Sequence, residues 1–91
     1  MSMAYRNFLT TEEYLNLPYP GKVLADYWAE FLPKMTAEMK ADGTLLPTLQ
    51  KRGTELFDME MELIEEQKMP VDAAWEFVKE EIYSLKPENT D

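Results

Sequence analysis

Hydrophobic positions recur every three or four residues along most of the chain, which is the period of a helix. The clearest stripe lies near the C-terminal end and comprises Val71, Ala74, Trp75, Val78, Ile82 and Leu85. No segment alternates with the two-residue period of a strand, and no Asn-Gly or Asp-Gly pair separates two strand-like runs. The pattern predicts an all-α domain, a small bundle of three to five helices with short connections.

The first predicted helix is short and begins at a capping box. Thr10 can cap its N-terminus, and Glu13 stands three residues later, where its side chain can return a hydrogen bond. Leu9 and Tyr14 occupy the positions of a hydrophobic staple. Residues 17–21 read Leu-Pro-Tyr-Pro-Gly, and the two prolines predict a turn there.

Proline and glycine divide the next part of the chain. Apolar residues recur at helical spacing from Lys22 to Leu32, and Pro33 then either kinks this helix or separates it from a second one. The second piece covers residues 33–41, and Gly43 is a suitable C-terminal stop. The sequence leaves both possibilities at Pro33 open.

The longest predicted helix covers residues 45–68, and Thr44 can cap it. Gly53 lies in its middle, where glycine costs about 1 kcal/mol relative to alanine. Close packing of another helix explains such a glycine, and a tolerated weak point is the equal alternative. A last helix is predicted over residues 71–85.

These elements predict one helical domain over residues 9–86. We expect residues 1–8 to form a flexible N-terminal segment and residues 87–91 to form a flexible polar tail. The N-terminal residues lack the apolar core of a signal peptide, and no apolar run is long enough to cross a membrane. A cytoplasmic location without membrane binding is the expectation.

Charge is distributed unevenly between the two parts of the chain. The net charge is −9, from 18 acidic and nine basic residues. Residues 1–54 contain six acids and six bases, whereas residues 55–91 contain twelve acids and three lysines. A surface this acidic disfavours direct nucleic-acid binding, which requires positive charge, and favours a basic partner surface.

Carboxylates in the acidic part follow two helix faces. They comprise Glu55, Asp58, Glu62 and Glu65, with Glu66 beside them, on the long helix, and Asp72, Glu76 and Glu80 on the last helix. Carboxylates one turn apart are separated by about 5.4 Å along the axis, which is comparable to the spacing of phosphates along a nucleic-acid strand. Two neighbouring ridges of this kind could occupy a nucleic-acid-binding cleft. The alternative is an ordinary solvated helix face.

The apolar arc of the long helix spans about 200°, whereas a surface helix needs little more than roughly 100°. The excess indicates burial on two sides, and Phe57, Met59 and Met61 could anchor a partner or a second copy in a homodimer. The alternative is the central helix of a small bundle. Glu60 falls within this arc, where a carboxylate is desolvated unless it is paired or lies at the edge.

The sequence contains neither histidine nor cysteine. This removes Ser-His and Cys-His catalytic pairs and the usual zinc ligands. Glycine loops that hold phosphates, the EF-hand pattern and the Gly-x-Ser-x-Gly motif are also missing. We expect a protein that is not an enzyme and has no catalytic residue, cofactor or metal site.

Several short segments between residues 22 and 85 resemble small helical proteins related to the transposon-encoded TnpV family. They are Tyr27-Trp28, Pro33-Lys34, Gly43-Thr44-Leu45, Leu49-Gln50, Leu63-Ile64-Glu65-Glu66-Gln67, Ala74-Trp75-Glu76 and Val78-Lys79-Glu80-Glu81. The resemblance implies a helical fold and a mobile-element or phage setting. It implies no catalytic residue.

Together these features predict an acidic protein-binding module of phage or mobile-element type. It would inhibit or modulate a basic, nucleic-acid-binding protein by presenting carboxylates to that protein's surface, as a DNA mimic or an anti-CRISPR-like protein does. The alternative is a self-associating transposon or phage accessory protein whose acidity serves only solubility.

Overall fold

The computed structural model describes residues 3–88, and over that range every regular element is a helix. The elements are the 3₁₀ helix η1 (Ala4–Asn7) and the α-helices α1 (Thr11–Leu15), α2 (Tyr19–Phe31), α3 (Pro33–Asp42), α4 (Leu45–Glu65) and α5 (Val71–Ile82). The prediction of a small all-α bundle is confirmed.

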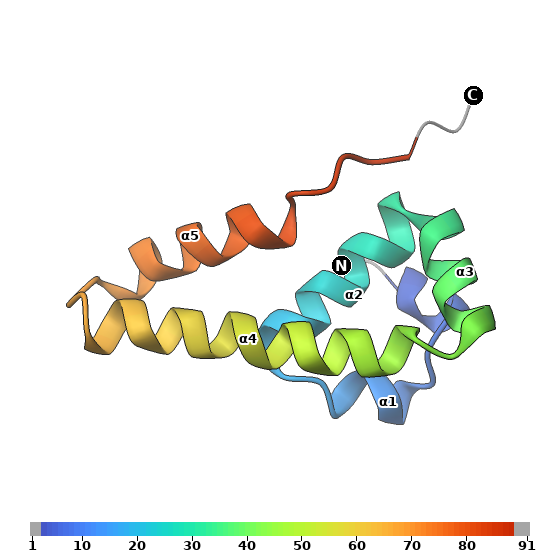
Figure 1. Cartoon of the computed structure of the whole chain (residues 1–91), viewed down its shortest axis with the longest axis horizontal. Coiled ribbons are helices and arrows are strands. Elements are labelled where there is room, and N and C mark those ends of the chain that lie inside the picture. Colours follow the sequence, from blue (N-terminus) through green and yellow to red (C-terminus); the bar gives the residue numbers. More distant parts are fainter. Residues whose placement is uncertain (1–2, 89–91) are drawn as a thin grey trace.

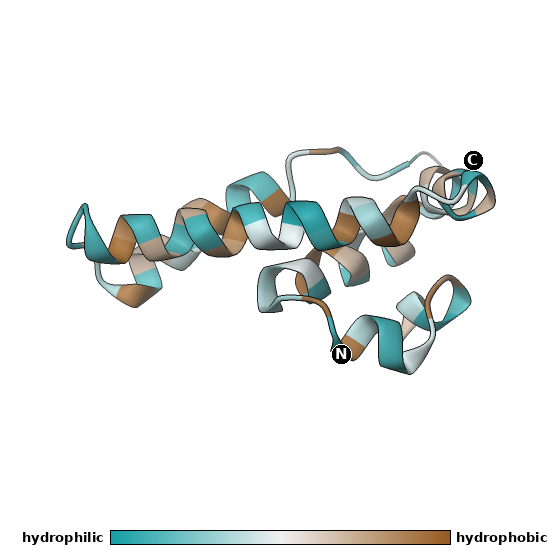
Figure 2. Ribbon diagram, turned by 60° about the horizontal axis from the view of Figure 1, so that its bottom comes forward, coloured by the Kyte–Doolittle hydropathy of each residue, from teal (hydrophilic) through white to brown (hydrophobic). Residues whose placement is uncertain are grey.

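The longest helix, α4, runs along the molecule, and α5 returns antiparallel to it (Figure 1). The shorter α2 contacts η1, α1, α3, α4 and α5 and is therefore the central helix of the bundle. The α4–α5 turn lies at one end of the molecule, and α3 lies at the other (Figure 1). Figure 2 shows hydrophobic and hydrophilic residues interleaved along the helices, as expected when each helix buries one face.

The hydrophobic core forms where α2, α4 and α5 meet. Its buried members from these helices are Leu24, Ala25, Trp28, Ala29, Leu49, Leu56, Val78 and Ile82. Leu45, at the start of α4, extends the core toward α3, and Tyr5 and Leu9 close it on the N-terminal side. The apolar stripes that define the helices in the sequence are thus the faces that they bury.

Two glycines allow α2 and α4 to cross closely. A Cβ atom on Gly53 would lie 2.9 Å from the Cα atom of Gly21, and one on Gly21 would lie 3.2 Å from the Cα atom of Gly53. Such distances leave no room for a side chain. The interpretation of Gly53 as a site of close helix packing is confirmed.

Pro20 and Pro33 each lie in the first turn of a helix, α2 and α3 respectively. Residues 17–21 do not form the predicted turn, because α2 already begins at Tyr19 and includes Pro20 in its first turn. The missing N–H of proline costs nothing there, since the first backbone donors of a helix have no internal partner. At Leu32 the backbone leaves the helical region, and Pro33 begins α3, so Pro33 separates two helices.

The helix caps agree with the sequence at two of three positions. Thr10 and Glu13 form the expected capping box, and Gly43 ends α3 with a left-handed φ of 81°. Thr44 does not cap α4 with its side chain, because its backbone (φ −97°, ψ −9°) is not in the extended conformation of a capping residue; its hydroxyl donates to the Asp42 carboxylate. That part of the prediction is wrong.

The last two helices are shorter than predicted. Helix α4 ends at Glu65, three residues early, and Lys68 in the connection adopts a positive φ of 58°. The Met69 N–H donates to the Leu63 carbonyl and closes this turn. Helix α5 ends at Ile82, after which the chain continues along α2 toward the start of α3.

Parts of both predicted flexible ends make fixed contacts. Tyr5, in η1, is buried and stacks on Tyr14 with ring centroids 3.7 Å apart. The Glu88 N–H donates to the Phe31 carbonyl at 2.8 Å. Residues 1–2 and 89–91 of the predicted flexible segments lie outside the described residues.

Candidate functional site

The acidic face of α4 points away from the core. Its predicted site residues Glu55, Asp58, Glu62, Glu65 and Glu66, which we call the α4 ridge, are all exposed. They lie opposite the buried face that contacts α2, because the helical period separates the two sets. The structure thus presents the α4 ridge to solvent.

The charges of the α4 ridge are largely uncompensated. Glu55 pairs with Arg52 at 2.9 Å, one turn earlier on the helix. Within residues 3–88, the other four carboxylates make no ion pair. Asp58, Glu62 and Glu65 therefore stand as a run of exposed negative charge at intervals of about one turn.

The α5 ridge comprises Asp72, Glu76 and Glu80, and all three are exposed. Glu76 pairs with Lys79 at 2.9 Å, and this contact raises the pKa of the Lys79 ammonium group. Asp72 lies in the first turn of α5, where a negative charge is favourable for the helix dipole. One of the three carboxylates of the α5 ridge is therefore paired, compared with one of five on the α4 ridge.

The predicted apolar anchors differ in how accessible they are. Phe57 is 43% exposed, whereas Met59 and Met61 are half-buried. Met59 packs against the hydrophobic core and has a structural role. Phe57 is therefore the anchor that a partner would reach most easily.

Glu60 lies within the apolar arc of α4, between Leu56 and Ile64 on the helical wheel. It is half-buried, and among the described residues it forms no ion pair. Neither of its carboxylate oxygens belongs to the fully buried, unpartnered atoms of the described chain. At least part of the Glu60 carboxylate thus stays in contact with water.

Sequence reasoning missed a half-buried carboxylate on α2, that of Asp26. The Tyr14 hydroxyl donates to Asp26 Oδ2 at 2.9 Å, while Asp26 Oδ1 is buried without a partner among the described residues. Burial raises the pKa of Asp26, the bond from Tyr14 opposes this, and the nearby Glu30 adds to the rise. The two partners are twelve residues apart, so no local motif reveals the pair.

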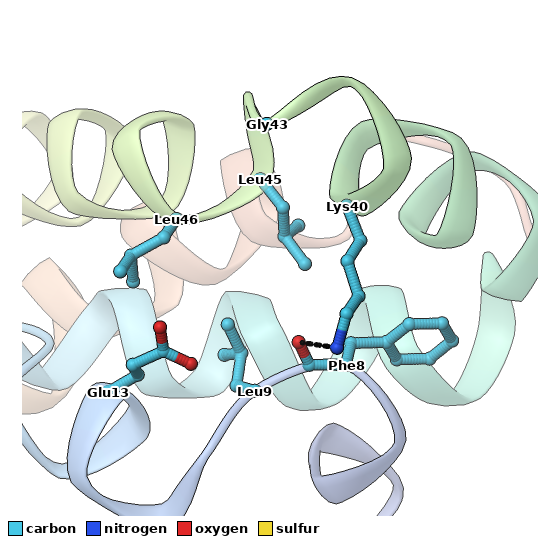
Figure 3. Close-up of a pocket in the computed structure, with 7 residues that line it drawn as sticks. All are labelled: Phe8, Leu9, Glu13, Lys40, Gly43, Leu45 and Leu46. Atoms are coloured by element: carbon cyan, nitrogen blue, oxygen red, sulfur yellow. Dashed lines mark hydrogen bonds between the residues drawn. The ribbon is translucent and has the colours of Figure 1, made fainter.

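A small hollow lies between the N-terminal segment and the α3–α4 corner (Figure 3). Its volume is about 180 Å³, below the roughly 300 Å³ at which ligand pockets begin. Lys40 Nζ in its wall donates to the Phe8 carbonyl at 3.1 Å, and Glu13 is engaged in the capping box. Both charged groups are thus engaged in contacts within the fold.

Over residues 3–88, no three Asp or Glu side chains converge as metal ligands would. No helix in this range has the length and apolar character needed to cross a bilayer.

The chain was also compared with protein-family models, with curated proteins and with solved structures. None of them matches it. The resemblance to TnpV-related proteins therefore stays a prediction that rests on the short segments quoted above.

Proposed function

We propose that the protein is an acidic binding module without enzymatic activity, which inhibits or modulates a nucleic-acid-binding protein. The α4 ridge would contact the basic surface that otherwise holds phosphates, and the α5 ridge would extend the contact. The observation that carries the proposal is the exposed, unpaired run Asp58, Glu62 and Glu65. Charges arranged in this way complement a surface of lysines and arginines.

The stability of the chain gives no reason for this run. Like charges one turn apart destabilise a helix by roughly 0.2–0.5 kcal/mol per pair, and alternating lysines would remove the cost. No basic residue occurs between Arg52 and Lys68. A binding role accounts for carboxylates that the fold itself does not need.

The mobile-element setting that the TnpV resemblance implies is compatible with this role. Phages and mobile elements encode many short acidic proteins that block host nucleic-acid machinery, and anti-CRISPR proteins are one such group. This support is an analogy of size, charge and setting.

Self-association is the second candidate function, and the exposure of Phe57 favours it. In that case the apolar flank of α4 would pair with a second copy, and the acids would only keep the protein soluble. The two functions differ in their response to salt. Binding through carboxylates weakens as salt rises, whereas an apolar dimer does not.

Capture from a nuclease-treated bacterial lysate tests the proposed function. We expect the immobilised protein to retain a basic nucleic-acid-binding protein at about 50 mM NaCl and to release it at about 500 mM. The ridge variant, Asp58→Asn/Glu62→Gln/Glu65→Gln, should lose this partner while keeping its helical circular dichroism spectrum.

A matched control removes three carboxylates elsewhere. The control variant, Glu12→Gln/Glu30→Gln/Glu38→Gln, has the same net charge as the ridge variant, and its three positions are exposed on α1, α2 and α3. It should capture the partner as the unmodified protein does. Equal capture by the ridge variant, or recovery of the chain alone, would contradict the proposal.

A further inference from the structure

Aromatic side chains of α2 and α5 meet along the contact between the two helices. Tyr19 packs against Trp75 with ring centroids 5.1 Å apart, and Tyr83 meets Tyr27 edge-on at 4.9 Å. Tyr27 in turn contacts Phe31 at 5.2 Å. We call these five residues the aromatic seam.

The aromatic seam is open to solvent over much of its length. Tyr19 is 59% exposed, Tyr83 is 48% exposed and Phe31 is 42% exposed. Trp75 and Tyr27 lie half-buried beneath them. Large aromatic side chains clustered in this way at a surface are typical of binding sites, because the fold gains little from leaving them exposed.

Charged residues of α5 border the aromatic seam. Glu76, Lys79, Glu80 and Tyr83 line a shallow depression. Lys79 stands four residues after Trp75 and four before Tyr83, so the helical period places it between the two ends of the seam. Lys79 pairs with Glu76, while Glu80 makes no ion pair within the described residues.

We propose that the aromatic seam, with Glu76 and Glu80 beside it, binds arginine side chains of a basic protein segment. This inference rests on the proposed function and names the chemistry of the partner. A guanidinium group is planar and weakly hydrated, so it stacks on aromatic rings while its N–H groups pair with carboxylates. Lysine offers only a compact, strongly hydrated charge and satisfies this surface less well.

Positive charge distinguishes an arginine-containing segment from the other molecules that bind to aromatic rings. Single-stranded nucleic acid stacks its bases on aromatic side chains, but its phosphates would meet Glu76 and Glu80. A membrane with anionic lipids would be repelled in the same way. A second copy of the chain would bring its own carboxylates to the contact. A cationic peptide fits both the rings and the charges.

Two synthetic peptides of equal length and charge test the proposal, one rich in arginine and one in lysine. Titration followed by NMR should move the indole N–H signal of Trp75, while that of Trp28, which is buried in the core, stays in place. The arginine peptide should bind about two- to fivefold more tightly for each stacked guanidinium.

The Tyr19→Leu/Tyr83→Leu variant removes two exposed rings and keeps apolar side chains at these positions. It should bind the arginine peptide only as tightly as the lysine peptide. Phe77→Leu is the matched control, because Phe77 is an exposed aromatic residue of α5 outside the aromatic seam. That variant should keep the full preference for arginine.

Replacement of Lys79 provides a second test. Because Lys79 pairs with Glu76, Lys79→Gln frees this carboxylate for an incoming guanidinium. We expect the variant to bind the arginine peptide about two- to threefold more tightly than the unmodified protein does. Weaker binding would show that Lys79 supports the site, contrary to the proposal.

The outcomes separate this inference from the proposed function. If the unmodified protein binds both peptides equally tightly, and the ridge variant binds both more weakly, arginine selection is overturned and the proposed function stands. Failure of both peptides to bind at low salt would count against both. Tighter binding of a single-stranded oligonucleotide than of the arginine peptide would assign the aromatic seam to nucleic acid and overturn the inference. A dimer in sedimentation experiments that Tyr19→Leu/Tyr83→Leu dissociates would assign the seam to a second copy of the chain and also overturn it.

Discussion

At the scale of single residues, Asp26 is the carboxylate that the fold holds in the least favourable surroundings. One of its oxygens accepts a hydrogen bond from Tyr14, and the other is buried without a partner among the described residues. Burial raises the pKa of Asp26 above its ordinary value of 3.8. At pH values between 3.8 and this raised pKa, the folded state therefore binds more protons than the unfolded state does. The stability that neutral Asp26 provides is therefore lost as the pH rises through this window.

Asp26→Asn should remove this dependence on pH. We expect the free energy of unfolding of the variant, relative to that of the unmodified protein, to increase as the pH rises above 3.8 and then to level off. Urea unfolding at a series of pH values measures the difference. A difference that is constant with pH would mean that Asp26 ionises as freely in the fold as in the unfolded chain.

Tyr14→Phe tests the same pair from the other side. Loss of the hydroxyl leaves both Asp26 oxygens without the hydrogen bond and should lower the free energy of unfolding by about 1–3 kcal/mol. The pKa of Asp26 should rise further, because the bond from Tyr14 lowers it. NMR titration of the Asp26 carboxyl group follows this shift, and an unchanged pKa would contradict the assignment.

Gly53 tests the close crossing of α2 and α4. Gly53→Ala improves helix propensity, but the new Cβ atom would lie 2.9 Å from Gly21 Cα, and backbone must move to admit it. We expect the free energy of unfolding to fall by about 1–3 kcal/mol. Thr54→Ala, at the exposed next position, should change it by less than about 0.5 kcal/mol. A stabilising Gly53→Ala would refute the packing role.

At the scale of elements, the start of α3 depends on a residue far along the chain. The backbone N–H groups of Lys34 and Met35 both donate to the Glu88 carboxylate at 2.9 Å. This carboxylate acts as the cap that Leu32, the residue before the helix, cannot provide. The segment after α5 is fixed further by the Tyr27 hydroxyl, which donates to the Leu85 carbonyl at 2.6 Å.

Glu88→Ala should therefore destabilise the whole domain. We expect a loss of about 1 kcal/mol in the free energy of unfolding, the usual cost of removing a helix cap. Glu81→Ala is the control, because Glu81 is exposed and its carboxylate makes no hydrogen bond or ion pair within residues 3–88. If thermal unfolding of the two variants is the same, the long-range cap contributes nothing.

The contrast between local and long-range caps explains what the sequence could predict. The capping box at Thr10 and the stop at Gly43 need only neighbouring residues, and both were predicted correctly. The cap on α3 comes from Glu88, 54 residues beyond its Lys34 partner, and no spacing rule connects them. The turn predicted at residues 17–21 failed because proline favours both turns and the first turn of a helix.

At the scale of the whole molecule, repulsion among carboxylates opposes folding. Raising NaCl from about 10 mM to about 500 mM should increase the free energy of unfolding, because salt screens exposed charges. The ridge variant should be more stable than the unmodified protein by about 0.5–1 kcal/mol at low salt and should respond less to added salt. Destabilisation by salt would show that attractive ion pairs dominate instead.

The candidate site was predictable to the same degree as the fold. The spacing of Asp58, Glu62 and Glu65 places them on one helix face, and their exposure follows from the apolar stripe opposite. The aromatic seam was not predictable, because Tyr19 and Trp75 come together only through the packing of α5 on α2. Sequence periodicity describes faces of single helices, whereas surfaces shared by two helices require the tertiary structure.

Competition for a nucleic-acid-binding protein tests the central claim most directly. The measurement is the fluorescence anisotropy of a labelled DNA duplex bound to the basic protein captured from the lysate, as this chain is added. We predict that the unmodified protein and the control variant displace the duplex and that the ridge variant does not. The claim that the α4 ridge occupies a phosphate-binding surface would be contradicted by either of two results. In one, the ridge variant displaces the duplex as well as the control variant does; in the other, the unmodified protein and both variants fail to displace it.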